Sequence, residues 1–319
     1  MSEQPSILSP RVLIPFITVT FIWGATWIVI KDQLGVVPES WSVTYRFLLA
    51  GTVMFIVAAV TRVPIILKRD GMILAAIFGV AQFTFNFNFV YRAEIYVTSG
   101  LVAVVFALLF VPNALFSRLF LGQKISGRFF IGSGLSIIGI ALLFVNEARG
   151  DERDLVSTLT GIGFTLAGVL SASTANVLQA TERARAQPMA SLLAWGMVFG
   201  SIVNGSFAWI TTGPPVVDMR LGYFLGIAYL GIIGSALAFT LYFGMIRLIG
   251  PAKAAYSSVT IPVVAMLIST IFEGYHWTPL AVAGCVTALS GLAVALVRAS
   301  RLDRLEKRVA SLTHVLLSG

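Results

Sequence analysis

The sequence predicts an all-α integral membrane protein with ten transmembrane helices, arranged as two inverted repeats of five helices each. Three observations support this fold class. Of the 319 residues, 57% are hydrophobic and 11% are charged, and the mean hydropathy is +0.91, values outside the usual range of soluble globular proteins. Apolar runs of membrane-spanning length recur along the chain, and the second half repeats motifs of the first half.

The apolar runs give the helix count. A helix of about 17 to 25 apolar residues crosses the roughly 30 Å hydrocarbon core of a bilayer. Such runs lie near residues 12–30, 41–60, 72–91, 97–118, 129–145, 159–178, 189–211, 221–246, 254–272 and 277–297. The N-terminal segment MSEQPSILSPR has no basic region followed by a small-residue cleavage site, so we expect the first run to remain as a span.

Internal repetition predicts a duplicated chain. Residues 97–123 resemble residues 248–274, and in these segments Pro112 and Pro262 each precede a polar residue by eleven positions. A pair of glycines seven residues apart also recurs in the fifth and tenth runs. Because five is odd, the second copy must enter the membrane with the opposite orientation. Inverted repeats of this kind are typical of secondary transporters that work by alternating access.

Three parts of the chain follow from this duplication: a first five-helix repeat at residues 1–148, a second and inverted repeat at 149–298, and a polar tail at 299–319. The leucines of the tail follow a three-four spacing, and its basic residues lie mostly off that stripe. We expect an amphipathic basic helix on the cytoplasmic leaflet. A short coiled coil between protomers is the alternative, although a monomer is the simplest expectation.

The basic residues predict the orientation in the membrane. With ten spans both termini lie on one side, and sixteen basic residues fall on that side against five on the other. The positive-inside rule then predicts a multi-pass protein of a bacterial inner membrane with both termini in the cytoplasm. The net charge of +8 reflects this topology and contact with the lipid bilayer, so nucleic acid is not an expected partner.

The segment FTFNFNFVYR at residues 83–92 places asparagines inside an apolar run. Its strict alternation is typical of a strand, but a single strand would leave backbone groups unsatisfied in lipid, so we expect a helix. On a helix Thr84, Asn88 and Tyr91 share one face, and Asn86 lies on another face together with Gln82. We predict that the first face lines a cavity and that Asn86 bonds to a neighbouring helix, although the two amides could exchange these roles.

Prolines and glycines suggest how the helices move and pack. A proline inside a span frees the carbonyl four residues earlier, and interrupted helices at matching positions of two repeats point to a substrate site. We therefore predict that Pro112 and Pro262 are conformational hinges, with static kinks as the alternative. The glycine pairs of the fifth and tenth spans predict close helix packing at an interface between the two copies.

The motifs WGATW in the first span, YRFLLAG in the second and IGSGLSIIGIALL in the fifth, together with the prolines of the fourth and ninth spans, resemble the drug/metabolite transporter superfamily in its EamA-type branch. The resemblance covers residues 11–298, nearly the whole chain. Within that branch the chain is most similar to bacterial exporters of aromatic amino acids. The resemblance implies export of aromatic and other neutral amino acids by alternating access.

An amino-acid carrier needs an aromatic or apolar wall together with groups that bind a carboxylate and an ammonium. The predicted substrate-binding wall consists of Trp23, Trp27, Trp195, Tyr242 and Tyr256. Packing among helices is the alternative role for the two tryptophans of the first span.

Cationic groups near the spans are few. Arg46 lies inside the second span, where a charge normally faces a partner or water, and Lys253 begins the ninth span. Both are candidates to bind a substrate carboxylate, and snorkelling toward the membrane surface is the alternative for each.

The acidic residues all map to loops, tails or span ends, with Glu94 and Glu273 nearest to the membrane interior. Because proton-coupled carriers commonly use an intramembrane carboxylate, uncoupled facilitated transport is favoured. A lone Cys285 and two histidines outside the spans indicate no metal site, no cofactor and no enzymatic activity. A channel, a carrier of phosphorylated or nucleotide sugars, and a membrane subunit with a separate ATP-driven motor remain as alternatives.

Overall fold

The structure is a computed structural model that describes residues 9–97, 99–123, 125, 127–150, 155–272 and 277–296. All regular secondary structure within these ranges is helical, which confirms the all-α prediction there. The predicted amphipathic tail at 299–319 lies outside the described residues.

The first half of the chain consists of helices α1 to α7, with two short irregular helices. They are α1 (Pro10–Asp32), α2 (Glu39–Val60), α3 (Arg69–Gly79), η1 (Val80–Asn86), α4 (Phe87–Tyr96), α5 (Ser99–Phe106), η2 (Ala107–Leu109), α6 (Phe110–Leu121) and α7 (Gly127–Gly150). The predicted boundary between the repeats, after residue 148, therefore falls in the last turn of α7.

The second half follows the same order. It contains α8 (Leu155–Ala180), α9 (Glu182–Arg185), α10 (Met189–Thr212), α11 (Leu221–Ala228), η3 (Tyr229–Leu237), α12 (Ala238–Ile249), α13 (Pro251–Ala254), α14 (Ser257–Phe272) and α15 (Pro279–Leu296). Among the described residues, the short α9 has no counterpart in the first half, and η2 has none in the second half.

Eight helical segments among the described residues are long and apolar enough to cross a membrane. They correspond to the first four and the sixth to ninth predicted spans. The predicted fifth and tenth spans are helical as well, but their apolar parts, Gly127–Leu143 and Pro279–Gly291, are shorter. The structure therefore supports a multi-pass helical membrane protein, and eight of the ten predicted spans meet the length and hydropathy of a transmembrane helix.

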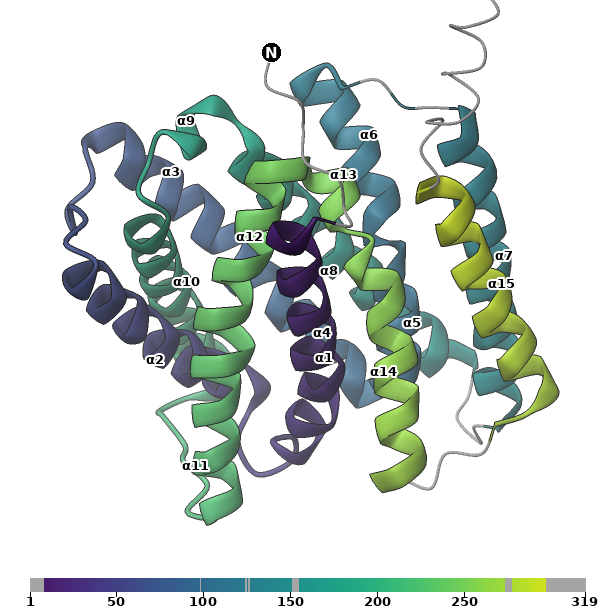
Figure 1. The fold of residues 1–319 in the computed structure, drawn as a ribbon. Coiled ribbons are helices and arrows are strands. Elements are labelled where there is room, and N and C mark those ends of the chain that lie inside the picture. The colour runs from purple at the N-terminus through teal and green to yellow at the C-terminus, as the bar shows by residue number, and fades with distance from the viewer. Residues whose placement is uncertain are drawn as a thin grey trace, which may run out of the picture.

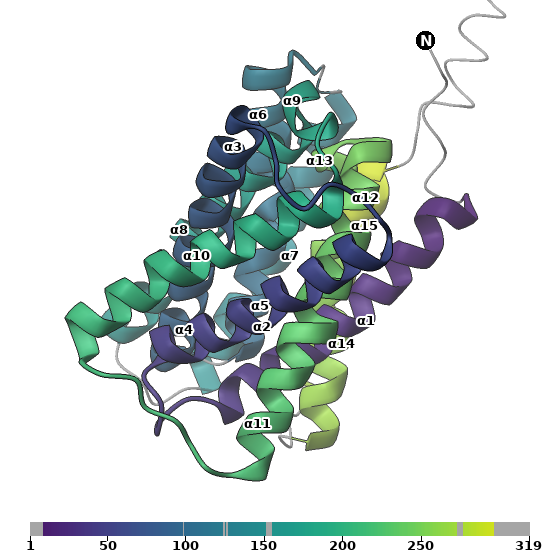
Figure 2. The same ribbon diagram turned by 90° about the vertical axis from the view of Figure 1, so that its left-hand side faces the viewer.

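Helices from the two halves pack against each other throughout the molecule. α2 lies along α10, and α7 lies along α15 at the opposite edge (Figure 1). Between these two pairs, α1 packs against α12 and α14, while α8 packs against α4, α5 and α6. The view turned by 90° shows α2 and α10 side by side in front of this central group (Figure 2). The halves thus interlock around a common centre.

Glycines allow the close approach of paired helices. A Cβ atom added at Gly139 of α7 would lie 2.3 Å from the backbone nitrogen of Ala288, and one at Gly291 of α15 would lie 2.4 Å from that of Ser136. Side chains at either glycine would collide with backbone. The predicted interface between copies at the fifth and tenth spans is confirmed by these contacts.

Two spans in each half are interrupted at corresponding points. The third span contains the π-helix η1 and the eighth contains the π-helix η3. In the fourth span the 3₁₀ turn η2 separates α5 from α6, and in the ninth span two residues, 255 and 256, separate α13 from α14. Short π- and 3₁₀-segments inside helices often mark functional sites because they redirect backbone groups and side chains.

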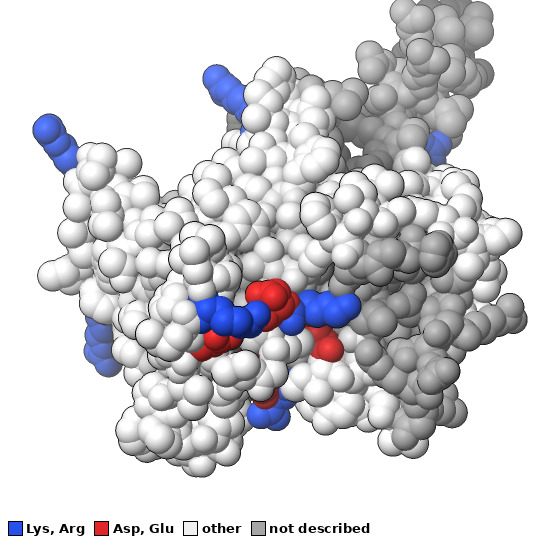
Figure 3. Space-filling view, turned by 90° about the horizontal axis from the view of Figure 1, so that it is seen from below, with Lys and Arg blue, Asp and Glu red and all other residues white. Residues whose placement is uncertain are grey.

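One end of the molecule carries a cluster of ion pairs. Arg92 of α4 contacts Glu39 of α2 at 3.2 Å, while Arg220 contacts Asp218 at 2.6 Å and Asp32 of α1 at 3.6 Å. Basic and acidic side chains lie next to one another on this face (Figure 3). It is the end predicted to face away from the cytoplasm, and these five described charges lie in pairs.

Candidate functional site

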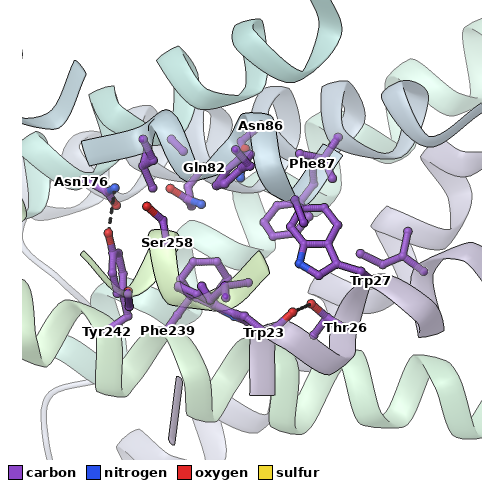
Figure 4. Close-up of a pocket in the computed structure, with 18 of the residues that line it drawn as sticks. Trp23, Thr26, Trp27, Gln82, Asn86, Phe87, Asn176, Phe239, Tyr242 and Ser258 are labelled. Carbon is purple, nitrogen blue, oxygen red and sulfur yellow. Dashed lines mark hydrogen bonds between the residues drawn. The ribbon is translucent and has the colours of Figure 1, made fainter. Parts of the chain in front are cut away.

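A central cavity lies where the interrupted spans of both halves meet. The space between atoms there amounts to about 700 Å³, a value that includes open solvent. Both halves contribute to its wall (Figure 4). The lining residues are Trp23, Thr26, Trp27, Ile30, Arg46, Gln82, Asn86, Phe87, Val90, Ala103, Phe106, Leu109, Ala172, Asn176, Phe239, Tyr242, Ser257, Ser258 and Ile261.

Aromatic rings form much of this wall. Trp23 packs against Tyr242 with ring centroids 4.9 Å apart and against Phe239 at 5.2 Å. Trp27, one helical turn further along α1, approaches Phe106 at 6.1 Å. The structure therefore places three of the predicted wall residues, Trp23, Trp27 and Tyr242, around one cavity.

Arg46 supplies the positive charge of the cavity. Only 1% of this residue is exposed, so it does not snorkel to the membrane surface. Its Nε donates to Ser235 Oγ at 2.9 Å, and its guanidinium carbon lies 4.5 Å from the ring centre of Phe87. Longer hydrogen bonds of 3.5 Å reach the Tyr91 hydroxyl and the Gly234 carbonyl. These partners are all neutral, so they hold the guanidinium in place without cancelling its charge.

A backbone carbonyl of the π-helix η3 holds Arg46 and Trp23 in place. The carbonyl of Gly234 accepts hydrogen bonds from both Trp23 Nε1, at 3.1 Å, and Arg46. The other π-helix is used in a similar way, because the Ala81 carbonyl of η1 accepts from Ser171 of α8 at 2.8 Å. In each half a π-helix thus receives a side chain from a span of the other half.

Three buried polar atoms in the cavity wall have no hydrogen-bond partner among the described residues: Gln82 Oε1, Asn86 Oδ1 and Trp27 Nε1. Gln82 and Asn86 are 3% and 2% exposed. Their side chains lie on η1 across the cavity from the α1 tryptophans (Figure 4). A buried polar group without a partner is costly, so each of these atoms needs a partner that the described residues do not supply.

The prediction that Thr84, Asn88 and Tyr91 line the cavity is wrong. The amide of Asn88 accepts from Ser40 Oγ at 2.7 Å and donates to the Thr84 carbonyl and to Asn204 Oδ1. Thr84 donates to the Gly200 carbonyl at 2.9 Å. These side chains tie η1 and α4 to α2 and α10, and Asn86 faces the cavity instead.

Tyr91 is also absent from the cavity wall. Its hydroxyl lies 3.4 Å from Gln33 Oε1 and receives the long bond from Arg46, so it supports Arg46 from behind. The face that carries Asn86 lines the cavity, and the face that carries Asn88 does not. Which face does so depends on the rotation of the helix about its axis, and the alternation of Phe and Asn in the sequence does not determine that rotation. Gln82 shares the face of Asn86 at a spacing of four residues, and that signal was present in the sequence.

Three other predicted binding residues lie away from the cavity. Trp195 donates to the Ile65 carbonyl at 2.8 Å and packs against Phe55 at the edge of the bundle. Tyr256 packs near Phe110 in a separate apolar cluster, and Lys253 lies in α13 outside the lining set. Asn176 and the two serines that follow Tyr256, Ser257 and Ser258, line the cavity instead, and sequence reasoning missed them.

The predicted hinge prolines both lie beside an interrupted helix. Pro112 is the third residue of α6, directly after η2, and Pro262 is in the second turn of α14. The two interruptions touch, because Ser258 Oγ lies 3.1 Å from the Ala107 carbonyl oxygen. Motion at these points remains a prediction, but both prolines adjoin segments that contribute residues to the cavity.

The fold and the cavity define a class of protein: a duplicated, multi-pass helical membrane protein with a central site between its halves. The EamA-like transporter family matches residues 11–145 and 159–297, one segment in each half. The chain belongs to this transporter family.

Curated relatives are similar over most of their length. The chain is 29% identical over 276 residues to the uncharacterized inner membrane transporter YedA of Escherichia coli, covering 83% of this chain and 85% of the relative. It is 21% identical to protein PagO of Salmonella typhimurium, with 82% and 84% covered. It is also 24% identical to a probable amino-acid metabolite efflux pump of Salmonella typhimurium, with 86% and 91% covered.

A solved crystal structure has the same fold. The TM-score is 0.72 at 17% identity, and the alignment covers 91% of this chain and 97% of the other.

Proposed function

We propose that this transporter exports amino acids, aromatic and other neutral ones, by alternating access without coupling to an ion gradient. The observation that carries the proposal is the cavity itself, where the buried Arg46 guanidinium faces an aromatic wall. A carboxylate is the natural partner of such a cation, and the rings of Trp23 and Phe239 suit an apolar or aromatic side chain. Similarity to a probable amino-acid metabolite efflux pump supports this choice.

The charge of the cavity argues against the alternative of phosphorylated or nucleotide sugars. Among the lining residues Arg46 is the one formally charged side chain. A phosphate group carries up to two negative charges at neutral pH, and sites for such anions normally gather several Lys or Arg residues. Lys253 does not line the cavity, so the wall supplies a single positive charge, which matches a single carboxylate.

Alternating access is supported by the interlocked halves. In the proposed arrangement ten spans form two inverted five-helix repeats, and the cavity lies near the middle of the bilayer. Exchange of the two repeats between equivalent conformations would open the site to each side in turn. The contact between Ser258 and Ala107 lies at the crossing of the two interrupted spans, where such an exchange must bend the chain.

The sidedness follows from the basic residues. We propose that both termini face the cytoplasm of the bacterial inner membrane and that the ion-pair cluster of Figure 3 faces outward. A reporter enzyme that is active only outside the cytoplasm should give no signal when fused to the C-terminus. Activity of that fusion would overturn the proposed orientation.

Transport by purified protein in liposomes tests the function. Wild-type protein should exchange labelled phenylalanine against unlabelled phenylalanine inside the vesicle, and equal initial rates with and without imposed pH and potential gradients would support uncoupled movement. Arg46→Gln should weaken binding of phenylalanine at least tenfold, whereas Arg92→Gln, which removes a charge outside the cavity, should leave binding unchanged. Flux that neither saturates nor shows counterflow would indicate a channel and contradict the proposal.

A further inference from the structure

The geometry points to a binding subsite for a protonated amine, formed by the neutral amide oxygens of Gln82 and Asn86. This inference rests on the proposed function and adds to it a rule of selectivity: the carrier accepts zwitterions and rejects cations that lack a carboxylate. The subsite lies in the wall contributed by η1 and is separate from the guanidinium of Arg46.

The two amides are presented together. Gln82 and Asn86 are four residues apart on η1, both line the cavity, and both are almost fully buried. Gln82 Oε1 and Asn86 Oδ1 have no hydrogen-bond partner among the described residues. In protein interiors such acceptors are nearly always satisfied, so two of them in one cavity wall indicate a donor that is supplied from outside the chain.

Neighbouring helix α8 packs against Asn86 and holds the backbone of η1. A Cβ atom added at Gly168 would lie 3.3 Å from the Asn86 carbonyl oxygen and 3.4 Å from Asn86 Oδ1, so α8 packs directly against this residue. Ser171, one turn further along α8, donates to the Ala81 carbonyl of η1 at 2.8 Å. The acceptors therefore belong to a segment that is held against α8.

Charge determines which donor fits. An ammonium group is the donor that best matches two neutral carbonyl oxygens, because it carries several N–H groups and makes charge-assisted hydrogen bonds. The cavity wall contains no Asp or Glu among the described residues, and it contains the positive charge of Arg46. A simple cation would therefore be repelled and poorly solvated. In a zwitterion the carboxylate offsets Arg46, so the ammonium can be held by oxygens alone.

The unpartnered Trp27 Nε1 is consistent with this arrangement. It is a donor in the same cavity, and an indole N–H can only donate. It cannot bind an ammonium, but it can donate to a carboxylate. The wall thus provides donors on the α1 and α2 side and acceptors on the η1 side, which matches the two ends of an amino acid.

Binding to purified full-length protein with three related probes tests the subsite. The probes are phenylalanine, phenethylamine, which lacks the carboxylate, and hydrocinnamate, which lacks the amine. Wild-type protein should bind phenylalanine at least tenfold more tightly than phenethylamine. Gln82→Leu and Asn86→Leu should each weaken phenylalanine binding at least fivefold and leave hydrocinnamate binding within twofold of wild type.

A variant that is expected to bind a probe more tightly separates a specific effect from misfolding, because a misfolded protein would lose binding. Asn86→Asp places a carboxylate at the subsite and should strengthen phenethylamine binding at least fivefold. Asn88→Asp is the matched control, because Asn88 lies two residues away and faces α2 and α10; it should give no gain.

The outcomes separate the two proposals. Wild-type protein that binds neither phenylalanine nor hydrocinnamate would overturn the proposed function and this inference with it. Phenylalanine binding that survives both Leu substitutions, or that falls equally with hydrocinnamate binding, would overturn the inference alone. Wild-type protein that binds phenethylamine as tightly as phenylalanine would also overturn the inference alone.

Discussion

The Ser258 hydroxyl of α14 is shared between two carbonyl acceptors, that of Ala255 at 2.6 Å and that of Ala107 in η2 at 3.1 Å. Ser258 and Ala107 lie in corresponding spans of the two halves, each beside an interruption of its helix. The interruptions therefore cross at one point, and Ser258 also lines the central cavity. A change in the bend of either span would be felt at the cavity and in the other half at the same time.

This crossing predicts a role for the prolines in turnover more than in binding. Pro112→Ala and Pro262→Ala restore a backbone N–H and should straighten their spans, which makes the bend harder to change. We expect several-fold slower exchange of phenylalanine in liposomes, with equilibrium binding changed less than twofold. Pro15→Ala, in the uninterrupted α1, should change neither quantity. Normal exchange rates in both variants would show that the prolines are static kinks.

Close contact between α3 and α10 predicts a large effect of one methyl group. A Cβ atom at Gly79 would lie 2.1 Å from the Gly196 carbonyl oxygen, and backbone cannot move aside as a flexible side chain can. Gly79→Ala should therefore destabilise the protein by about 1–3 kcal/mol, seen as a lower Tm in detergent. Gly163→Ala, with no atom within 4 Å of the added carbon, is the control and should keep the wild-type Tm.

Several parts of the fold were predictable from the sequence because the bilayer imposes simple rules. The length of apolar runs located the spans, and repeated prolines and glycines revealed the duplication. Positions that depend on helix rotation were not predictable. Asn86 and Asn88 differ only in the direction they face, and that direction is set by packing of η1 and α4 against α2, α8 and α10. The π-helices were missed as well, since hydrophobic periodicity over seven to nine residues does not distinguish a π-turn from an α-turn.

The candidate site was predictable where a residue type is unusual for its setting. Arg46 is a charged residue inside a span, and Trp23 and Trp27 are large aromatic residues one turn apart, so residue type and position alone mark them as candidates. Gln82, Asn176 and Ser258 are ordinary polar residues that become important only through the helices around them. Tyr256 and Trp195 show the opposite error, because an aromatic residue in a membrane protein more often packs than binds.

The hydrogen bonds of Asn88 predict a structural role. Asn88→Ala would leave Ser40 and Asn204 without their amide partner in the interior, which costs about 1–3 kcal/mol. We expect a lower Tm, with phenylalanine affinity in the folded protein within twofold of wild type. Asn86→Ala should show the reverse pattern, weak binding with little change in Tm. Loss of affinity in Asn88→Ala at an unchanged Tm would restore the face predicted from the sequence.

The ion-pair cluster predicts sensitivity to acid. The backbone N–H of Arg220 donates to the Asp218 carboxylate at 2.9 Å, and the Arg220 guanidinium donates to it at 2.6 Å. These two hydrogen bonds, the backbone one first, lower the pKa of the Asp218 carboxyl below its usual value. A lowered pKa in the folded state contributes stability above the unfolded value of about 3.9. That stability is lost as the pH falls through the lower folded value.

Unfolding measurements across this pH range check the effect. Asp218→Asn should lower the Tm at pH 7 relative to wild type, and the difference should shrink as the pH is taken below about 4. Asp70→Asn, in the first turn of α3, is the control for removing an acidic residue. A Tm difference that is the same at both ends of the pH range would mean that the ion pair does not contribute to stability.

Polar side chains between α6 and α8 predict where water enters the molecule. Asn176 of α8, which lines the cavity, lies 3.4 Å from Asn113 of α6. One turn further along these helices, Gln179 is 1% exposed and neither of its amide atoms has a hydrogen-bond partner among the described residues. The Ser117 hydroxyl of α6 is buried without a partner as well. The positions of α14 that correspond to Asn113 and Ser117 by the spacing of the prolines are the apolar Val263 and Leu267.

Because these two positions of α14 are apolar, the fold does not require the polar seam formed by Asn113, Ser117 and Gln179, and we expect water to reach this seam from the end predicted to be cytoplasmic. In a Cys285→Ser background, Gln179→Cys should react with a membrane-impermeant maleimide in inside-out vesicles and much more slowly in right-side-out vesicles. Leu170→Cys, on the exposed apolar surface of α8, should stay unreactive in both because lipid covers it. Equal labelling of Gln179→Cys from both sides would contradict the predicted sidedness, and no labelling from either side would mean that the seam is dry.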